Sequence, residues 1–490
     1  MLDAALRPLG VPLPEVAEDP LRFPGLAERL ARLPAGSDAR AVEVGLLTLG
    51  DVEVVVARGR FDVLAGSMGR SHGAAVATAL AVARERRLPF VALVASGGAR
   101  VQEGLHALLQ MARVAEGLRS LRAAGVPALT FLGEPSTGGV LASYASLADV
   151  ILADPDATVG FAGPRVVERV TGTPVGADSH RGRTAFAAGL VDGLAGPAEA
   201  PVLLGRWAAL LHPGARGGPL PTDDAATDGA DPAVAEPPVA DLPAEEVLRR
   251  TRELARPSAR TLLHTLLEDA VELSGDRAGG VDPVAVAGVG RLGRRSVVMV
   301  GTDREALGAC GRRGMPGPAA YRTLRRALTL ASRHDLPVVA LIDTVGADPS
   351  PCAERGGVAG AIAETFVDLL AVPGPTVAVV TGEGGSGGAL ALGAADRLLI
   401  QDDAFLSVIA PESAAAILRD GAVDDGELSR HLRLRPADLR QEGIVDEVLP
   451  GPTTAGEAAA TAALRRRLVA TLRALDAEPD RLARRSARYG

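Results

Sequence analysis

A long internal repeat limits the fold of this chain more than any other feature of its sequence. Residues 126–164 match residues 374–412 at an offset of 248. Two shorter pairs keep the same order: 88–100 with 336–348, offset by 248, and 189–197 with 443–452, offset by 254. Solenoids and propellers repeat roughly every 20–50 residues, so this period is too long for them. The repeat therefore predicts two copies of one domain.

Each copy is predicted to be an α/β domain. Apolar, β-branched runs such as "VALVAS" (91–96) and "VVALID" (338–343) indicate buried strands, and each is followed by a glycine-rich turn and a helix. Strands that alternate with helices are typical of α/β layers. For the helix after residue 100 we expect one buried stripe made of Leu105, Leu108, Ala112, Leu118 and Leu121.

A linker is predicted between the two copies. Residues 212–243 are rich in Pro, Ala, Gly and Asp and show no hydrophobic period. The 490 residues are enough for two or three ordinary domains. We therefore expect one domain over residues 1–211 and a second over residues 244–490.

The residue types exclude several kinds of chemistry. The chain has no lysine, so all 52 basic residues are arginine. It therefore cannot form a lysine Schiff base or carry biotin or lipoate on a lysine of its own. Cys310 and Cys352 are the only cysteines, too few for a disulfide framework or a four-cysteine zinc site, and we expect them to be packed or idle. The seven histidines show no H-E-x-x-H spacing, so no metal is expected.

Charge and hydropathy predict a cytoplasmic protein that binds neither nucleic acid nor a membrane. The net charge is −8 and only 2% of the residues are aromatic, which disfavours contact with phosphates and bases. No apolar run approaches the roughly 18 residues of a membrane span. The first twenty residues contain acids and prolines where a signal peptide would have an apolar core.

The stretch "GEGGSGG" (382–388) places five glycines between a predicted strand and a predicted helix. We align Gly387 and Gly388 with Gly138 and Gly139 of the first copy, which also follow a strand. The N-terminus of a helix presents free N–H groups, and glycine lets a negatively charged oxygen approach them. Two oxyanion holes, one in each copy, are the favoured interpretation.

Two other interpretations of these glycines stay open. "GGSGG" matches the G-x-S-x-G nucleophile elbow, with Ser386 as the nucleophile and His431 downstream, but the first copy has Thr137 at the aligned position. Alternatively, the glycines serve tight turns and close packing of helix on strand.

Two arginine-containing segments also have more than one interpretation. "SGGAR" (96–100) could hold a phosphate, or Arg100 could pair locally within a turn. The arginine-rich segment from Leu464 to Arg488 is predicted to be a solvated helix rather than a nucleic-acid patch.

The motifs together resemble a known family. The first half is similar to the β subunit, and the second half to the α subunit, of the bacterial acetyl-CoA carboxylase carboxyltransferase. In the first half the resemblance rests on "GSMG" (66–69), "SGGARVQEG" (96–104), "STGGV" (136–140) and "VGFAGPRVVE" (159–168). In the second half it rests on "GDRA" (275–278), "GMPGPAAYR" (314–322), "IDTVGA" (342–347), "AERGG" (353–357), "GEGGSGGALA" (382–391) and "SVIAPESAAAIL" (407–418).

The resemblance implies a crotonase-type fold in both halves and an active site between a β-like and an α-like domain. It implies that carboxybiotin on a separate carrier protein delivers a carboxyl group to the α-carbon of an acyl-CoA. Gly138 and Gly139 would hold the thioester enolate oxygen, and Gly387 and Gly388 the biotin ureido oxygen. The implied substrate-binding residues are Ser96, Gly97, Gly98, Arg100, Gly163, Arg165, Gly346 and Arg355. The implied partners are a biotin carboxyl carrier protein, a biotin carboxylase and a second copy of the chain, as a homodimer.

The chain also departs from the family pattern. The β subunit usually begins with a four-cysteine zinc ribbon, whereas no cysteine precedes Cys310 here. The usual lysine-containing run of the α subunit is replaced by "VGTDREALGAC" (300–310). Two alternative functions therefore remain: a malonyl-thioester decarboxylase that does not use biotin, and a non-catalytic assembly subunit.

Overall fold

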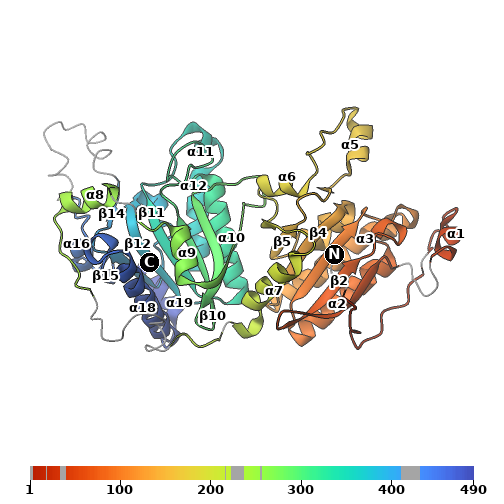
Figure 1. Cartoon of the computed structure of the whole chain (residues 1–490), viewed down its shortest axis with the longest axis horizontal. Helices are drawn as coiled ribbons and strands as arrows, with labels where there is room; N and C mark the ends of the chain where they lie inside the picture. The colour runs from red at the N-terminus through yellow and green to blue at the C-terminus, as the bar shows by residue number, and fades with distance from the viewer. Residues whose placement is uncertain are drawn as a thin grey trace. The chain divides into compact units, whose positions relative to one another are not determined.

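The computed structural model describes residues 4–17, 19–33, 40–215, 217–221, 237–253, 256–409 and 431–489. The chain divides into two compact units (Figure 1). Unit 1 comprises Met1–Ala215 and Arg277–Gly279, and unit 2 comprises Arg216–Asp276 and Gly280–Gly490. Residues 222–236 of the predicted linker and residues 410–418 of the last motif lie outside the described residues.

Unit 1 is built on a sheet with the strand order β1-β2-β3-β4-β5-β7, and β6 pairs with the end of β4. The β1–β2 pair is antiparallel, whereas β2–β3, β3–β4 and β4–β5 are parallel. The strands are β1 (Val42–Leu49), β2 (Val52–Gly59), β3 (Phe90–Ser96), β4 (Ala128–Thr137), β5 (Val150–Ala153), β6 (Val159–Gly160) and β7 (Gly193–Leu194). The principal helices are α2 (Arg70–Arg86), α3 (Leu105–Ala123), α5 (Pro164–Thr171), α6 (Gly182–Ala187) and α7 (Ala200–Leu211). A single turn of helix, α4 (Gly138–Val140), and a π-helical turn, η3 (Leu141–Ala145), follow β4.

Helices cover both faces of this sheet. Alternate residues of the strands form one core with α2 and α3, while α7 packs against β1, β2 and β4. A strand covered on both faces has no polar side to present, which explains the uninterrupted apolar runs of the sequence.

The predicted stripe of α3 is wrong at its N-terminal end. Leu105 is 69% exposed and Leu108 is 49% exposed. Ala112 is also exposed. Leu118 and Leu121 are buried as predicted, and the rest of the buried face consists of Ala107, Gln110 and Val114. The helices α2 and α3 approach each other closely at two glycines: a Cβ on Gly73 would lie 2.5 Å from Gln110, and one on Gly117 would lie 2.8 Å from Leu80. This close approach selects the face of α3 that packs inward.

Unit 2 repeats the same architecture. Its sheet has the order β15-β13-β12-β11-β10-β9-β8, and β14 pairs with the end of β12. The strands are β8 (Glu268–Glu272), β9 (Ala285–Leu292), β10 (Arg295–Thr302), β11 (Val338–Thr344), β12 (Thr376–Gly385), β13 (Arg397–Gln401), β14 (Phe405–Ser407) and β15 (Glu447–Leu449). The helices are α8 (Ala244–Glu253), α9 (Ala259–Leu266), α10 (Pro318–His334), α11 (Pro351–Arg355), α12 (Val358–Leu370), α13 (Ser386–Leu390), α16 (Pro436–Gln441), α17 (Pro452–Ala455), α18 (Glu457–Asp476) and α19 (Arg481–Tyr489).

The sheet orders confirm the duplication. The antiparallel pair β9–β10 corresponds to β1–β2, and the parallel run β10-β11-β12-β13 corresponds to β2-β3-β4-β5. In each unit one short strand extends the ladder at the end of the longest strand. The two units are thus α/β domains of one topology, as the repeat predicts.

The C-terminal helices of unit 2 are structural, so the prediction of a solvated helix over 464–488 is wrong. Leu464, Leu468 and Leu472 of α18 are buried in a core with α9 and the sheet. The guanidinium of Arg485 is fully buried, and its Nη2 lies 2.6 Å from Asp396 Oδ2. It also donates to the carbonyls of Val372 and Gly374. Because every donor direction of a guanidinium is rigid, this arrangement fixes α19 against the end of β13.

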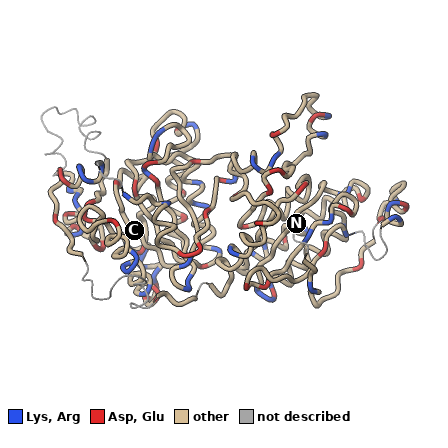
Figure 2. The backbone as a smooth tube through the Cα atoms, in the orientation of Figure 1, with Lys and Arg blue, Asp and Glu red and all other residues tan. Residues whose placement is uncertain are grey.

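Charged residues of both signs are interspersed along both units, without a large region of a single sign in the described part of the chain (Figure 2). Among the described helices, none is both long and apolar enough to cross a membrane.

Candidate functional site

In unit 1 a turn at the end of β3 is braced by a serine. Ser96 is buried, and its Oγ donates to the carbonyl of Gly66 at 2.7 Å and accepts the N–H of Gly98 at 3.0 Å. Gly98 has φ +111°, a conformation that favours glycine. Ser96 and Gly98 therefore shape the turn, and their polar groups are engaged within the chain.

This turn meets the glycine pair that follows β4. A Cβ on Gly138 would lie 2.7 Å from Gly98 Cα, and Gly138 has φ +60°. The N–H of Gly138 donates to the carbonyl of Phe161 at 2.9 Å. Gly138 is thus required by the close approach of the two turns, and its amide is not available to a ligand.

Two other amides remain at this junction. Among the described residues, no acceptor lies within hydrogen-bonding reach of the N–H of Ala99, which follows Gly98. Gly139 lies in the first turn of α4, where N–H groups have no partner within the helix. A Cβ on Gly139 would lie 3.5 Å from the Ala99 side chain, so the two residues are neighbours. These two amides are therefore candidate donors to a bound oxygen.

Two side-chain hydrogen bonds hold the segment after Gly139 in place. Ser143 Oγ donates to the carbonyl of Gly139 at 2.6 Å, and Tyr144 pairs with His72 at 3.1 Å between the hydroxyl and Nε2. Burial lowers the pKa of His72 to about 3, so its ring is neutral at physiological pH. This π-helical turn therefore has a fixed position beside the glycine pair; such turns are frequent at functional sites.

Unit 2 repeats this frame with a threonine. Thr344 Oγ1 donates to the carbonyl of Gly314 at 2.7 Å and accepts the N–H of Gly346 at 3.1 Å. Gly346 has φ +130°, and a Cβ there would lie 3.2 Å from the carbonyl of Gly385. Among the described residues the N–H of Ala347 has no acceptor, as for Ala99.

Strand register corrects our alignment of the two glycine pairs. Ser96 lies opposite Ser136, and Thr344 lies opposite Gly384, so β4 and β12 correspond at an offset of 248. The position that follows each strand is then Gly138 in unit 1 and Ser386 in unit 2, and both have positive φ, +60° and +67°. Gly139 corresponds to Gly387, one residue away from the pairing that we predicted.

Gly387 and Gly388 differ in their surroundings. A Cβ on Gly387 would meet nothing within 4 Å, whereas one on Gly388 would lie 2.6 Å from Tyr321 Oη and 2.7 Å from Ala347 N. Gly388 is therefore a packing glycine, and Gly387 faces open space. Tyr321 is fully buried, and its hydroxyl has no partner among the described residues.

Arg100 does not face a substrate. Its side chain is completely buried, pairs with Glu103 at 3.1 Å and donates to the carbonyl of Ser67 at 3.0 Å. This is the local pairing that the sequence left as an alternative, and it corrects the assignment of the Arg100 side chain to substrate binding.

The remaining predicted residues lie around the two turns or on exposed segments. Gly97 is exposed, and its N–H donates to Ala65 at 2.9 Å. Gly163 is the N-cap of α5, with open space where a Cβ would lie. Arg165 on α5 and Arg355 at the end of α11 are exposed.

The serine-nucleophile interpretation gains no support from the geometry. Ser386 is exposed, but among the described residues its hydroxyl makes no hydrogen bond to a histidine. A nucleophile of this kind needs a base within about 2.6–3.2 Å. Of the described side chains, no group of three or more His, Cys, Asp and Glu is arranged to hold a metal ion.

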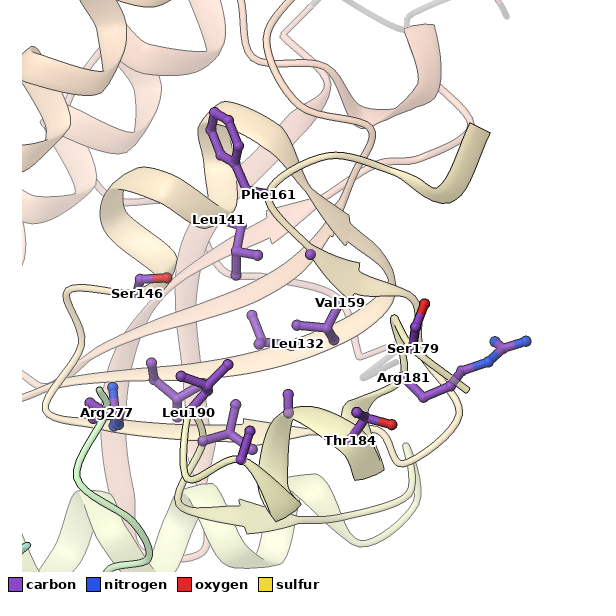
Figure 3. Close-up of a pocket in the computed structure, with 15 residues that line it drawn as sticks. Leu132, Leu141, Ser146, Val159, Phe161, Ser179, Arg181, Thr184, Leu190 and Arg277 are labelled. Carbon is purple, nitrogen blue, oxygen red and sulfur yellow. The ribbon is translucent and has the colours of Figure 1, made fainter. Parts of the chain in front are cut away.

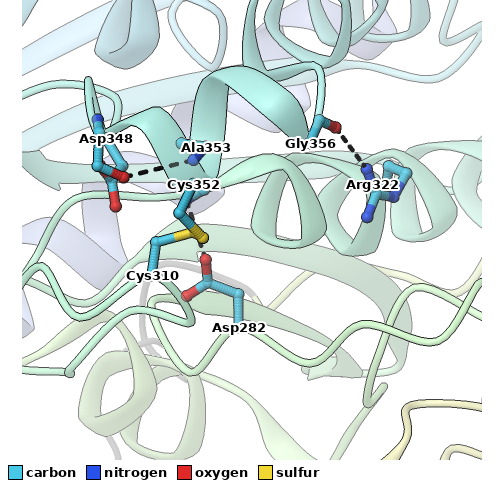
Figure 4. The surroundings of a disulfide bond; sticks show 9 residues. Asp282, Cys310, Arg322, Asp348, Cys352, Ala353 and Gly356 are labelled. Carbon is cyan, nitrogen blue, oxygen red and sulfur yellow. Dashed lines mark hydrogen bonds between the residues drawn. A yellow bond between two sulfur atoms is a disulfide. The ribbon is translucent and has the colours of Figure 1, made fainter.

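The two cysteines form a disulfide, which the sequence did not predict. Cys310 and Cys352 have Cα atoms 5.8 Å apart (Figure 4). Cys352 lies in α11, the helix that ends at Arg355, and Cys310 lies in the segment before α10. The bond therefore ties α11 to a segment whose Pro316 carbonyl accepts the N–H of Asp348 at 3.1 Å, next to Ala347.

Asp343, which lies in β11 just before the turn at Thr344 and Gly346, has a buried carboxyl group. Burial raises the pKa of Asp343 to about 6, opposed by the charges of Arg304 and Arg256. Its Oδ1 accepts the N–H of Glu383 at 2.9 Å, which joins β11 to β12 just before the glycine-rich turn.

The fold of this chain, two tandem α/β domains as predicted, is similar to the folds of solved structures. The transcarboxylase 12S structure, determined with hydrolysed methylmalonyl-CoA bound, aligns with a TM-score of 0.73 at 24% identity, over 94% of this chain and 85% of that chain. A single-chain, multi-domain long-chain acyl-CoA carboxylase aligns with a TM-score of 0.67 at 19% identity, over 88% of this chain and 41% of that chain. At these identities the likeness concerns the fold.

Sequence relatives identify the family. A Salinispora arenicola protein named acetyl-coenzyme A carboxylase carboxyl transferase subunits beta/alpha is 40% identical over 452 residues, 90% of this chain and 79% of the relative. A Mycobacterium tuberculosis protein named probable biotin-dependent acyl-coenzyme A carboxylase beta3 subunit is 35% identical over 463 residues, 94% of this chain and 90% of the relative. The family model described as acetyl co-enzyme A carboxylase carboxyltransferase-like matches residues 234–489. The chain belongs to the carboxyltransferase family of biotin-dependent acyl-CoA carboxylases, with β-like and α-like halves fused.

Proposed function

We propose that this protein is the carboxyltransferase component of a biotin-dependent acyl-CoA carboxylase. Residues 1–211 are the β-like domain and residues 244–490 the α-like domain, joined by the linker 212–243. The substrate is an acyl-CoA, and the carboxyl group is added at its α-carbon. Family membership and the pair of backbone donor sites support this proposal.

The observation that carries the proposal is the duplicated turn. Each unit joins a braced strand end to a glycine-rich helix start, with amide N–H groups that have no acceptor among the described residues. Carboxyl transfer through an enolate needs two sites that stabilise oxygens, and it needs no side-chain nucleophile. Each well-placed donor of this kind contributes about 2.7–4 kcal/mol of transition-state stabilisation.

In unit 1, we assign the thioester enolate oxygen to the N–H groups of Ala99 and Gly139. Gly138 sets the turn, and Ser96 and Gly98 fix the approach of the neighbouring loop. Gly97 and Arg165 are exposed, and together with Gly163 they are the proposed contacts to the CoA portion. The Arg100 side chain stabilises the turn through its ion pair with Glu103.

In unit 2, the residues fit a ureido oxygen. Carboxybiotin, when bound, supplies the carboxyl group. A Cβ on Gly387 would meet open space, and a Cβ on the next residue, Gly388, would lie 2.7 Å from Ala347 N. The N–H groups of Gly387 and Ala347 are therefore the proposed donors. Gly388 keeps the helix start packed on Tyr321, and Gly346 sets the turn. Arg355, exposed at the end of α11, is the proposed contact for an anionic group of the substrate or carrier.

The partners follow from this chemistry. Because the chain has no lysine to carry biotin, a biotin carboxyl carrier protein and a biotin carboxylase are required. We propose a homodimer in the cytoplasm. Exposed apolar side chains on α3 and α5, including Leu105, Leu109 and Val170, support self-association.

A decarboxylase that splits malonyl thioesters would use the same enolate site without biotin. An assay in the reverse direction separates the two functions. Purified protein is given malonyl-CoA with and without free biotin, and acetyl-CoA formation is followed by mass spectrometry. Biotin-dependent loss of the carboxyl group is the expected result. Loss that does not depend on biotin would establish the decarboxylase. No turnover would leave three alternatives: an unusual thioester substrate, a missing carrier protein or a subunit without catalytic activity.

A further inference from the structure

In unit 1, buried contacts fasten the turn after β3 to the segment before α2. The carbonyl of Met68 accepts the N–H of Arg100 at 2.9 Å, and the N–H of Met68 donates to the carbonyl of Gly98 at 2.8 Å. The Arg100 side chain adds a buried ion pair with Glu103. The turn that carries the Ala99 amide is therefore fixed by two backbone hydrogen bonds and one ion pair.

Two of these three contacts cannot form in unit 2. At the offset of 248, Pro316 stands in place of Met68, and its carbonyl accepts the N–H of Asp348 at 3.1 Å. Proline has no N–H, so the second backbone hydrogen bond cannot form. Asp348 itself stands in place of Arg100, and Pro351 replaces the acidic partner, so the ion pair cannot form either. The turn after β11 therefore needs another fastening.

The disulfide between Cys310 and Cys352 joins the two equivalent segments of unit 2 (Figure 4). Cys310 lies between β10 and α10, in the segment whose Gly314 carbonyl accepts the hydroxyl of Thr344. Cys352 lies in α11, directly beyond the turn. The covalent bond thus takes the place of the ion pair and the hydrogen bond that unit 1 has.

The disulfide is accessible from solvent. Cys352 is exposed, and Cys310 is half-buried. A thiolate can therefore approach the Cys352 end of the bond, which is the condition for thiol–disulfide exchange. In the cytoplasm proposed above, protein disulfides are rare, and those that form are usually transient or redox-sensing. A bond at this position is expected to open and close with the redox state of its surroundings.

Other contacts of the two segments do not depend on the bond. Asp282 accepts the N–H of Gly317, the N-cap of α10, at 2.9 Å. Ser350 caps α11 by accepting the N–H of Ala353 at 3.3 Å. Reduction should therefore loosen the link between the two segments without unfolding the unit.

We propose that Cys310 and Cys352 form a thiol–disulfide switch that controls the unit 2 site. The oxidised form holds the Ala347 amide in position for the ureido oxygen, and the reduced form lets this amide move. The inference rests on the proposed function, because that function assigns the ureido oxygen to Ala347.

A dithiol, either a small molecule or a protein, supplies the two electrons of the reduction. Its thiolate attacks the Sγ of Cys352, the S–S bond breaks, and the Cys310 thiolate takes up a proton. The second thiol of the reductant then attacks the mixed disulfide and releases Cys352 as a thiol. The products are two cysteine thiols and the disulfide of the reductant, and a disulfide oxidant reverses the reaction.

Hydrogen exchange of the oxidised and reduced full chain tests the switch without turnover. Because the chain has two cysteines, alkylation and mass spectrometry read its state directly, as no free thiol or two. Reduction with dithiothreitol should speed exchange over residues 345–356 at least about tenfold. Residues 97–108, the equivalent segment of unit 1, are the internal control and should not change. The double variant (Cys310→Ala with Cys352→Ala) should exchange like the reduced wild type in both buffers.

The reverse assay with malonyl-CoA and free biotin then tests the link to the unit 2 site. Reduction should raise the KM for biotin at least about fivefold and leave the KM for malonyl-CoA within about twofold. The thioester is assigned to unit 1, where the residues that line the cavity beside Gly138, among them Leu141 and Phe161 (Figure 3), lie outside the segments that the disulfide joins.

Equal exchange over residues 345–356 in the two forms would overturn the inference. So would a KM for biotin that dithiothreitol changes equally in the wild type and the double variant, or two free thiols in protein kept in oxidising buffer. The proposed function can fail separately, because exchange is measured without turnover. A redox-dependent exchange rate without biotin-dependent carboxyl transfer would keep the switch of the Ala347 turn and remove the carboxyltransferase.

Discussion

The glycine-rich turns of the two units share the same strand arrangement and the same bracing hydrogen bonds, but they differ in the first residue of the helix that follows. In unit 1 that residue is Gly138, pressed against Gly98, and in unit 2 it is Ser386, which is exposed. In unit 2 the tight contacts lie on either side of that residue, at Gly385 against the Val345 carbonyl and at Gly388 against Tyr321. The duplicated strands fix where the donors lie, and the residues that follow decide how much space each site leaves for a ligand.

The largest expected difference between the units comes from the disulfide, which is found in unit 2. Replacing both cysteines (Cys310→Ala with Cys352→Ala) should lower the free energy of unfolding by about 3–4 kcal/mol in oxidising buffer, because the bond closes a loop of 42 residues. Urea denaturation measures the effect. With dithiothreitol, the wild type should match the double variant. Equal stabilities in oxidising buffer would show that the bond does not form.

Exchanging the first residues of α4 and α13 tests this difference directly. Gly138→Ser should cost about 2–4 kcal/mol of unfolding free energy, because its Cβ would lie 2.7 Å from Gly98 Cα. Ser386→Gly relieves a positive φ and should be neutral or stabilising by up to about 1 kcal/mol. Urea denaturation of both variants tests this asymmetry. Similar changes for the two would mean that the turns are packed alike.

The next comparison is between Gly387 and Gly388 within unit 2. Gly388→Ala should destabilise by about 1–3 kcal/mol because its Cβ would meet Tyr321 and Ala347, while Gly387→Ala should stay within about 0.5 kcal/mol. Adding Tyr321→Phe to Gly388→Ala should restore part of the loss, because the nearest oxygen is removed. Thermal unfolding reports all of these variants. Equal costs at Gly387 and Gly388 would refute the division into an open and a packed glycine.

An effect of similar size concerns pH. Burial raises the pKa of Asp343 to about 6, so the folded state favours the protonated acid. The stabilisation is full below the ordinary pKa of about 3.9 and is lost as pH rises through about 6. Asp343→Asn should therefore gain stability relative to the wild type between pH 4.5 and pH 7.5, on the order of 1–3 kcal/mol. A difference that does not change with pH would mean that Asp343 is ionised throughout.

Much of the frame was predictable from the sequence, because a duplication shows as a constant offset. The offset of 248 placed both strand ends correctly. The equivalence of Gly138 and Ser386 was missed because each copy contains a Gly-Gly pair, and we aligned these pairs with each other. Only strand register and the sign of φ separate the two alignments.

Other features depend on partners that are distant in the sequence. Arg485 reads as a surface residue because its partner Asp396 lies 89 positions away. The exposed leucines of α3 fit a buried stripe by spacing, but the glycines at 73 and 117 select a different face. Ala99, Ala347 and Tyr321 lie within the family motifs, but only the structure shows that the N–H groups of the two alanines and the hydroxyl of Tyr321 have no partner among the described residues.

The central claim is that backbone amides, and no side-chain nucleophile, perform the chemistry. It is tested most directly by comparing Gly387→Val and Ser386→Ala in the biotin-dependent release of carboxyl groups from malonyl-CoA. Gly387→Val should lower the rate at least about 100-fold, because its side chain fills the open space at the donor site, with the fold retained. Ser386→Ala should keep activity within about threefold of the wild type. Loss of activity in Ser386→Ala, together with retained activity in Gly387→Val, would contradict this account.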